Sequence, residues 1–245
     1  MSEFKIPTEE VELPSKGLIY PEDNPLSSGK IEMKYMTAKE EDILTNQNYI
    51  KKGIVLDKLL KSLIVSDINY DDLVVGDKNA ILIAARILGY GRDYEFTYKD
   101  EPVTIDLTEL ETQYIDDSSF TKGLNSFSFT LPHTKTSITY KLLTNKDERK
   151  IDNEVKGLKK LDKQASPELS TRLKHMITSV NGESENKDIR EFVDIHMLAR
   201  DARAFREHIK TTQPDIKMQF VHTNENGVEE DATVPITAGF FWPDL

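Results

Sequence analysis

Cysteine is missing from this chain of 245 residues, and tryptophan occurs only once. Without cysteine the protein cannot form disulfide bonds, cysteine-ligated zinc sites or a thiol nucleophile. Its apolar runs fall well short of the roughly 18–20 residues of a membrane-spanning helix. Residues 1–7 are polar and lack the apolar core of a secretory signal. We therefore expect a cytoplasmic protein that neither spans nor docks on a membrane.

Positive charge is also scarce, with 32 Lys and Arg against 43 Asp and Glu and a formal net charge of −11. Nucleic-acid binding without sequence preference depends on a basic surface, so nucleic acid is not an expected partner. Charged residues make up 31% of the chain and hydrophobic residues 38%, a balance typical of a folded protein rather than a disordered one. The length suits one large domain or two smaller ones.

Recognisable catalytic motifs are lacking as well. The sequence has no Walker loop and no nucleophile elbow, and Gly89-Tyr90-Gly91 follows a predicted helix where a dinucleotide-binding motif would open one. We predict no metal, no cofactor, no small-molecule substrate and no enzymatic activity. An enzyme that uses scattered carboxylates with His196 or His208 is the least favoured alternative. None of the histidines has the spacing of a metal site; they are His133, His175, His196, His208 and His222.

The chain does contain one strongly apolar helix, predicted over residues 77–91. Asp77 is placed to cap its start, Gly89 and Gly91 suit its end, and the residues between are apolar nearly all round. A helix without a polar face is normally buried on several sides. Arg86, the only charge within the apolar run, then needs an acidic or carbonyl partner. We expect a structural ion pair, with Asp77 or another acid just upstream as the candidate.

Hydrophobic periodicity predicts the other elements. Apolar residues three and four apart indicate helices, and strict alternation indicates strands. Helices are expected at about 37–46, 55–65, 147–161, 166–181 and 188–211, the last being the longest. Strands are expected at about 30–36, 93–98, 103–107, 126–131, 137–143, 217–221 and 231–236.

Two of the predicted helices, one ending near Gly91 and one near Pro214, run directly into a β-hairpin. The expected fold class is therefore α+β, mostly helical, with two helix-plus-β-hairpin units and a small antiparallel β insertion. We expect three regions along the chain. They are an extended arm over 1–30, a helix-plus-hairpin domain with extra strands over 31–145, and a helical domain with a hairpin and an aromatic tail over 146–245.

Both ends of the chain carry apolar side chains that need a surface to cover them. We predict six residues of the proline-rich arm and the aromatic tail as partner-binding candidates, although either segment can instead dock on this chain's own core. These six are Leu13, Pro14, Tyr20, Phe240, Phe241 and Trp242.

The longest predicted helix carries further charged candidates. Asp201 and Arg206 are candidates for structural ion pairs, and Arg203 and Glu207 are four residues apart and able to pair. We favour a solvated helix face here over a partner-binding one.

Several short segments also occur in a distinctive order. Together they resemble a family of baseplate hub proteins from T-even-like contractile-tailed bacteriophages, most clearly over the first 110 residues and less so over the last 60. The segments are residues 13–17 with Tyr20, residues 36–44, residues 53–54 before 59–60, Asp72-Leu73 before Asp77, Arg86, residues 90–91 with Tyr94, and Asp201 and Arg206 before an end at residues 240–243.

This resemblance implies a non-enzymatic component of the tail baseplate hub that acts through contacts with other hub and tail proteins. Its location would be the virion tail, and the host cytoplasm during assembly. A transient chaperone for hub subunits, absent from the mature tail, is the alternative within the same assembly. Some family members carry Cys-x-x-Cys pairs on the two hairpins; residues 98–101 and 222–225 stand at those positions here, so the resemblance implies a lost metal.

Overall fold

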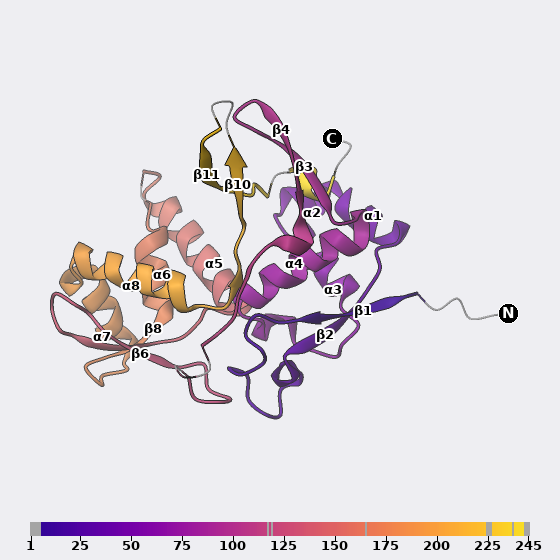
Figure 1. Cartoon of the computed structure of the whole chain (residues 1–245). Coiled ribbons are helices and arrows are strands. Elements are labelled where there is room, and N and C mark those ends of the chain that lie inside the picture. The colour runs from indigo at the N-terminus through magenta and orange to yellow at the C-terminus, as the bar shows by residue number, and fades with distance from the viewer. Residues whose placement is uncertain are drawn as a thin grey trace.

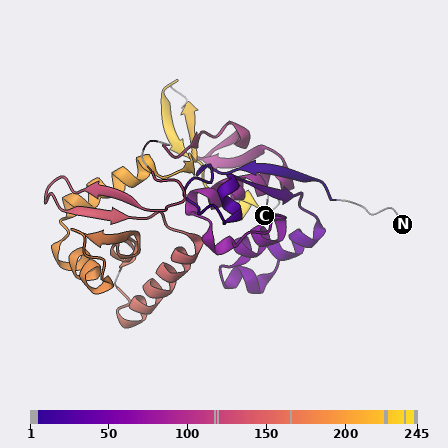
Figure 2. The same cartoon turned by 90° about the horizontal axis from the view of Figure 1, so that it is seen from below.

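Two hydrophobic cores divide the molecule into two lobes that lie side by side (Figure 1, Figure 2). The computed structural model describes residues 6–116, 118, 120–164, 166–223, 227–236 and 238–242. The first lobe is built mainly from residues up to 126 together with 214–242, and the second lobe mainly from residues 127–213, of which Leu142 packs into the first core. Helices account for 44% of the described residues and strands for 23%. The α+β class is thus confirmed, although helices make up less than half of the chain.

The first lobe packs its helices around α4, with small two-stranded sheets on the outside. Its helical elements are η1 (Pro25–Ser28), α1 (Ala38–Leu44), α2 (Gln47–Lys51), α3 (Val55–Leu63), η2 (Tyr70–Asp72), α4 (Val75–Tyr90), η3 (Leu107–Glu109) and η5 (Ala238–Phe240). Its strands pair as β1 (Thr8–Glu12) with β2 (Lys30–Lys34), β3 (Asp93–Tyr98) with β4 (Glu101–Asp106), β5 (Thr112–Gln113) with β9 (Asp215–Ile216), and β10 (Gln219–Thr223) with β11 (Glu229–Thr233).

The predicted arm over residues 1–30 is part of this lobe in the residues that the structure describes. β1 pairs antiparallel with β2, with Val11 opposite Ile31, and the following turn buries Leu13, Ile19 and Leu26. The arm therefore docks on its own chain.

Local sequence signals explain several of the helix ends. Thr37 and Glu40 form the predicted capping box of α1, which satisfies two backbone donors at once. Thr144 and Asp147 do the same at the start of α5 (Asn145–Leu161). The first hairpin turns at Lys99 and Asp100, both with positive φ (49° and 67°), the geometry that matches the twist of adjoining strands.

In the second lobe one three-stranded sheet packs against helices. Its strands are β6 (Phe127–Thr130), β7 (Ser137–Tyr140) and β8 (Ile177–Val180), in the order β6-β7-β8. Its helices are α5, α6 (Glu168–Met176), α7 (Asn186–Glu191), a π-helical turn (Phe192–His196) and α8 (Ala199–Thr212).

Two predicted helices of this lobe are wrong in extent. The helix expected over 166–181 stops at Met176, because Ile177–Val180 pairs with β7 as a third strand. The helix expected over 188–211 is interrupted at Met197 and Leu198. There the Met197 N–H donates to the carbonyl of Phe192, 2.8 Å away, closing the wider π-helical turn.

The predicted domain boundary near residue 145 does not separate the two cores. Strands β6 and β7 lie before it but belong to the second lobe, whereas β10, β11 and the aromatic tail lie after it but pack on the first. The cause is long-range packing: the chain leaves the first lobe, builds the second, and returns through Pro214.

Candidate functional site

The first predicted site residue, Asp77, lies at the centre of a buried polar network. Its Oδ1 accepts from the Ser15 N–H at 2.9 Å, and its Oδ2 accepts from the Ser15 and Tyr20 hydroxyls at 2.7 and 2.6 Å. The Tyr20 hydroxyl in turn accepts from the Val74 N–H at 3.0 Å. The helix begins at Val75, so Asp77 does not cap it as predicted; its carboxylate instead holds the Pro14–Tyr20 turn against α4.

Burial controls the ionisation of this network. Burial raises the pKa of Asp77, against the opposing effect of its hydrogen bonds with Tyr20 and Ser15. Burial and the nearby Asp77 also raise the pKa of Tyr20 well above its ordinary value. Both shifts follow from desolvation of the charged forms, and the network has the fully satisfied pattern of a structural support.

Arg86 is held without the acidic partner that was predicted. Its Nη1 donates to the Gly91 carbonyl at 2.8 Å and its Nη2 to the Asp93 carbonyl at 3.1 Å. The guanidinium lies 5.4 Å from the ring centre of Tyr90 and 5.9 Å from that of Tyr94, within cation–π range. Arg86 therefore joins the end of α4 to the start of β3, and burial lowers its pKa.

The aromatic tail packs against the same end of α4. Phe240 and Phe241 are 0% and 1% exposed, and Phe240 meets Tyr94 edge-on at 4.9 Å between ring centres. The Trp242 Nε1–H donates to the Leu44 carbonyl at 3.1 Å.

The partner-binding prediction for the arm and tail is therefore not supported in this conformation. The core of the first lobe buries Leu13, Pro14, Tyr20, Phe240 and Phe241 and half-buries Trp242. Large apolar side chains stabilise the fold most when they are covered, and here the chain covers its own.

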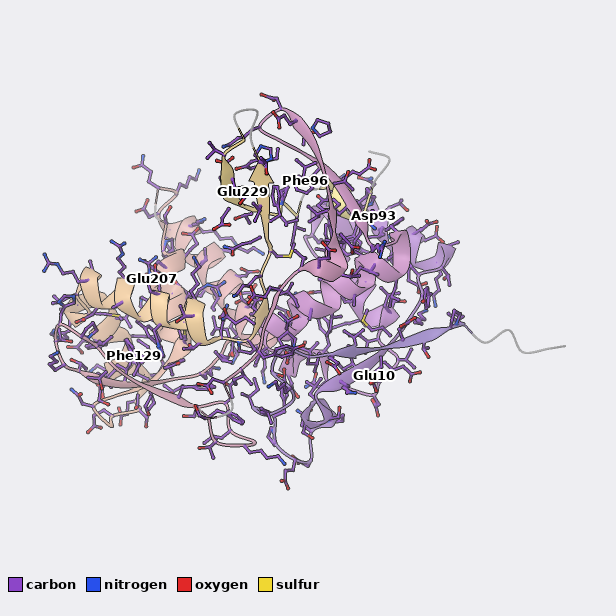
Figure 3. All side chains as sticks on the ribbon, viewed as in Figure 1. Glu10, Asp93, Phe96, Phe129, Glu207 and Glu229 are labelled. Atoms are coloured by element: carbon purple, nitrogen blue, oxygen red, sulfur yellow. The ribbon has the colours of Figure 1, made fainter. Side chains whose placement is uncertain are left out.

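The two β-hairpins meet each other, which was not foreseen from the sequence. Phe96 on β3 contacts Phe220 on β10 edge-on at 5.3 Å, and Tyr98 contacts His222 at 5.0 Å between ring centres. Figure 3 labels Phe96 and, on the opposite hairpin, Glu229.

One ion pair and one histidine–carboxylate contact lie beyond these rings, near the tips of the hairpins. Lys99 lies 2.5 Å from Glu230, and the His222 Nε2 lies 3.6 Å from the nearer Glu101 oxygen. The one sequence signal for the contact between the two hairpins was the likeness of the two helix-plus-hairpin units. Residues 222–225 stand where some members of the resembled family carry a Cys-x-x-Cys pair, and residues 224–225 of this segment lie outside the described residues.

In the second lobe Asp201 holds a turn rather than an arginine. Its two oxygens accept from the N–H groups of His133 and Thr134 at 2.8 and 3.1 Å. Burial acts to raise the pKa of Asp201, but these hydrogen bonds outweigh it and lower the pKa. Arg206, the other ion-pair candidate of this helix, is exposed, and its Nε–H donates to the Ala202 carbonyl at 3.4 Å.

The histidines considered for catalysis are separately placed. The His208 ring stacks on Phe129 at 4.4 Å, its Nε2 lies 2.9 Å from the Tyr140 hydroxyl, and burial lowers its pKa. His196 is exposed at the end of the π-helical turn. Among the described residues, no group of three or more His, Asp or Glu is arranged to hold a metal ion. Within that same part of the chain, no helix has the length and hydrophobicity to cross a bilayer.

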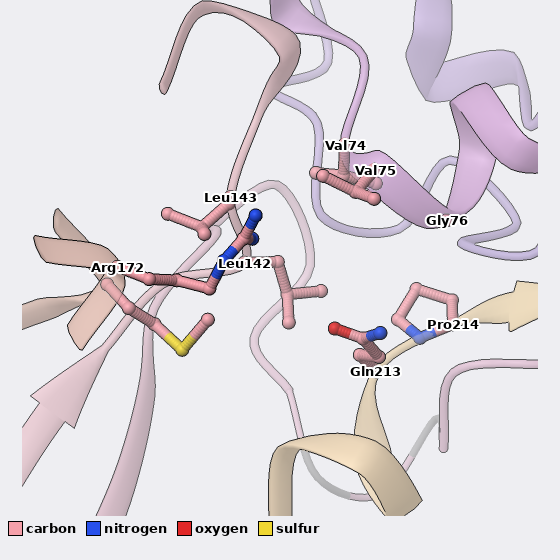
Figure 4. Close-up of a pocket in the computed structure, with 9 residues that line it drawn as sticks. Val74, Val75, Gly76, Leu142, Leu143, Arg172, Gln213 and Pro214 are labelled. Atoms are coloured by element: carbon pink, nitrogen blue, oxygen red, sulfur yellow. The ribbon is translucent and has the colours of Figure 1, made fainter. Parts of the chain in front are cut away.

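A cavity of about 70 Å³ lies at the seam between the lobes (Figure 4). Figure 4 shows residues from four separated segments converging on it: Val74–Gly76, Leu142–Leu143, Arg172 and Gln213–Pro214. The guanidinium of Arg172 already forms two bonds with Glu148, at 2.6 and 2.8 Å. A space of this size suits a few water molecules rather than a cofactor.

Charge is distributed unequally between the lobes. Residues 127–213 contain 17 Lys and Arg against 13 Asp and Glu, a net charge of +4. The rest of the chain contains 15 against 30, a net charge of −15. The net charge of −11 is therefore the sum of a basic second lobe and a strongly acidic first lobe.

Comparison with known proteins adds no assignment to this geometry. No protein-family model, curated protein or solved structure matches the chain.

Proposed function

We propose that this protein is a non-enzymatic component of a contractile-tail baseplate hub and that it acts through contacts with other hub and tail proteins. The proposal begins from the ordered segments that resemble the hub family. One structural observation supports treating them as a set: most of them converge on α4, although they lie up to about two hundred residues apart in the chain.

The convergence is specific in its contacts. The residues 13–17 turn and Tyr20 bind Asp77 at one end of α4, while Arg86 and Tyr94 join the hairpin and the tail at the other end. Their polar groups are largely occupied in holding segments together. Such an arrangement suits a rigid scaffold that presents surfaces to partners.

A transient assembly chaperone is the second candidate. The net charge of −15 on the first lobe supports it, because an acidic surface would screen a basic partner until assembly.

Quantitative peptide mass spectrometry of purified tailed particles, set against the infected-cell lysate, tests these proposals. A hub subunit is expected in particles at a fixed ratio to tail proteins. Abundance in the lysate with absence from particles would favour the chaperone. Absence from every fraction that contains tail proteins would overturn both. Truncation at Phe240 is a poorer test, because it removes core side chains.

A further inference from the structure

An open apolar groove of about 310 Å³ crosses the surface of the second lobe. Its apolar lining comes from Leu169 and Leu173 of α6, from Val193 in the π-helical turn and Met197 directly after it, and from Ala202 of α8. We call it the α6–α8 groove. Leu169 is 45% exposed, so this lining is accessible to a partner.

Exposed apolar side chains continue beyond the groove. Ile195 and Leu198, on the same turn and at the start of α8, are 71% and 51% exposed. Contiguous apolar surface of this kind typically marks an interaction site.

Basic side chains occupy the exposed side of α8. Arg200, Arg203, Arg206 and Lys210 are exposed, and none of the ion pairs found among the described residues includes them. Glu207, labelled in Figure 3, is the one exposed acid on this helix. Elsewhere in the lobe, by contrast, Lys174 pairs with Asp194 and Arg190 with Glu154.

These cations border the groove. Ala202 lines it, and Arg206 donates to the Ala202 carbonyl one turn away. Arg203 precedes Arg206 by three residues and so lies on the same side of the helix. Lys210 follows Arg206 by four residues and so lies one turn further on the same side.

The shape and chemistry of the groove together define its occupant. No strand borders it, because its lining comes from helices and the turn between them. An extended peptide would therefore find no backbone edge to pair with, whereas a helix satisfies its own backbone and needs only side-chain contacts. Apolar anchors on one face of that helix would fill the groove, and acids along its flank would meet Arg203, Arg206 and Lys210.

We propose that the α6–α8 groove binds an acidic amphipathic helix of a partner protein. Nucleic acid fits less well, because the groove is lined mainly by Leu, Val, Met and Ala side chains, with Ser166 and Ser170 beside them and no Lys or Arg in the lining. The inference does not depend on which assembly the protein joins.

Two fluorescein-labelled helical peptides provide the direct test with the full-length protein. Both carry leucine at helical spacings on one face; one has glutamate and the other lysine on the remaining positions. We expect the glutamate peptide alone to bind, with fluorescence anisotropy showing weaker binding as salt is raised. Equal binding of the two peptides, or of neither, would overturn the proposal.

Matched variants locate the site. Arg203→Glu with Arg206→Glu should weaken glutamate-peptide binding about tenfold or more, and Leu169→Asp should weaken it even at high salt. Lys146→Glu with Lys150→Glu makes the same charge change at exposed positions of α5 and should leave binding unchanged. Equal loss in the α5 variant would show non-specific attraction and contradict the inference.

Two further measurements separate other occupants. Sedimentation velocity of the protein alone should show a monomer; self-association abolished by Arg203→Glu with Arg206→Glu would make the occupant a second copy of this chain. Tighter binding of a single-stranded DNA oligonucleotide at the same residues would make it nucleic acid. Either result would overturn the partner-helix proposal.

Discussion

The two lobes use a buried carboxylate in different ways. In the first lobe Asp77 accepts hydrogen bonds from Ser15 and Tyr20, 62 and 57 positions away and both buried. In the second lobe Asp201 accepts from two backbone N–H groups of an exposed turn. The first carboxylate joins distant segments inside a core, whereas the second fixes the shape of a surface turn.

The lobes also differ in whether their charged groups are satisfied inside the protein or exposed. Around α4 in the first lobe, the polar groups of Asp77 and Arg86 are largely satisfied internally. The second lobe leaves the cations of α8 exposed beside an apolar groove. Internal contacts thus concentrate around α4, whereas the α6–α8 groove and the exposed cations beside it lie in the other lobe.

The largest expected effect is at the seam where the lobes meet. A methyl group at Gly76 would lie 1.7 Å from the Pro214 carbonyl oxygen, so Gly76→Ala must displace the backbone. We expect it to lower the free energy of unfolding by about 4 kcal/mol, measured by chemical denaturation.

Gly157→Ala is the matched control in the second lobe. A methyl group there meets nothing within 4 Å, and alanine favours a helix interior by about 1 kcal/mol over glycine. We expect this variant to be more stable than the wild type. If both alanine variants behaved alike, the close approach at the seam would have no energetic consequence.

The next largest expected effect is the loss of stability when either of the two buried carboxylates is removed. Asp77→Ala would leave buried donors of Ser15 and Tyr20 unpaired and should cost about 3 kcal/mol. Asp201→Ala frees two N–H groups that water can reach and should cost about 1 kcal/mol.

Trp242, the only tryptophan in the chain, belongs to the first lobe, so its fluorescence follows that lobe during denaturation. Circular dichroism follows both lobes. A larger loss of stability in Asp201→Ala than in Asp77→Ala would reverse the comparison.

The smallest expected effect is on acid sensitivity. Burial acts to raise the pKa of Glu40, but hydrogen bonds from Thr37, Lys34 and Ser62 lower it to about 2. In the second lobe Arg190 is the main cause that lowers the pKa of Glu154 to about 2.

Because both pKa values are depressed on folding, each carboxylate stabilises the fold fully above its ordinary pKa of about 4.5. That contribution is lost as the pH falls toward about 2. In Glu40→Gln and in Glu154→Gln, the stability lost on acidification should be smaller than in the wild type by about 1 kcal/mol. The difference is modest because the partly exposed partners of both carboxylates are screened by solvent. Denaturation at pH 7, 4.5 and 3 measures it; unchanged slopes in both variants would contradict the assigned ion pairs.

Local patterns predicted much of the fold. The capping box at Thr37, the helix around Ala80 and both hairpins appear as expected, because periodicity and turn residues act over only a few positions. Ile177–Val180 reads as helix from its spacing, but pairing with a strand some forty residues earlier overrides that preference.

The site residues were harder to predict for a related reason. Asp77 and Arg86 were expected to form structural ion pairs, yet their partners are Ser15, Tyr20 and two carbonyls rather than each other. Hydrophobicity indicates that a residue is buried but not what it meets. For that reason, Phe240 and Phe241 could not be assigned to their own chain or to a partner before the structure was known.

The return of the chain through Pro214 has a consequence for how the protein forms on the ribosome. The second lobe is one continuous stretch, so it can collapse as soon as residue 213 has emerged. The first lobe lacks β10, β11, Phe240 and Phe241 until later residues are made. Its early helices must therefore wait with uncovered apolar surface while an entire later lobe is synthesised, a period in which chains are exposed to aggregation. The part of the molecule with the most deeply buried contacts is thus the last to be completed.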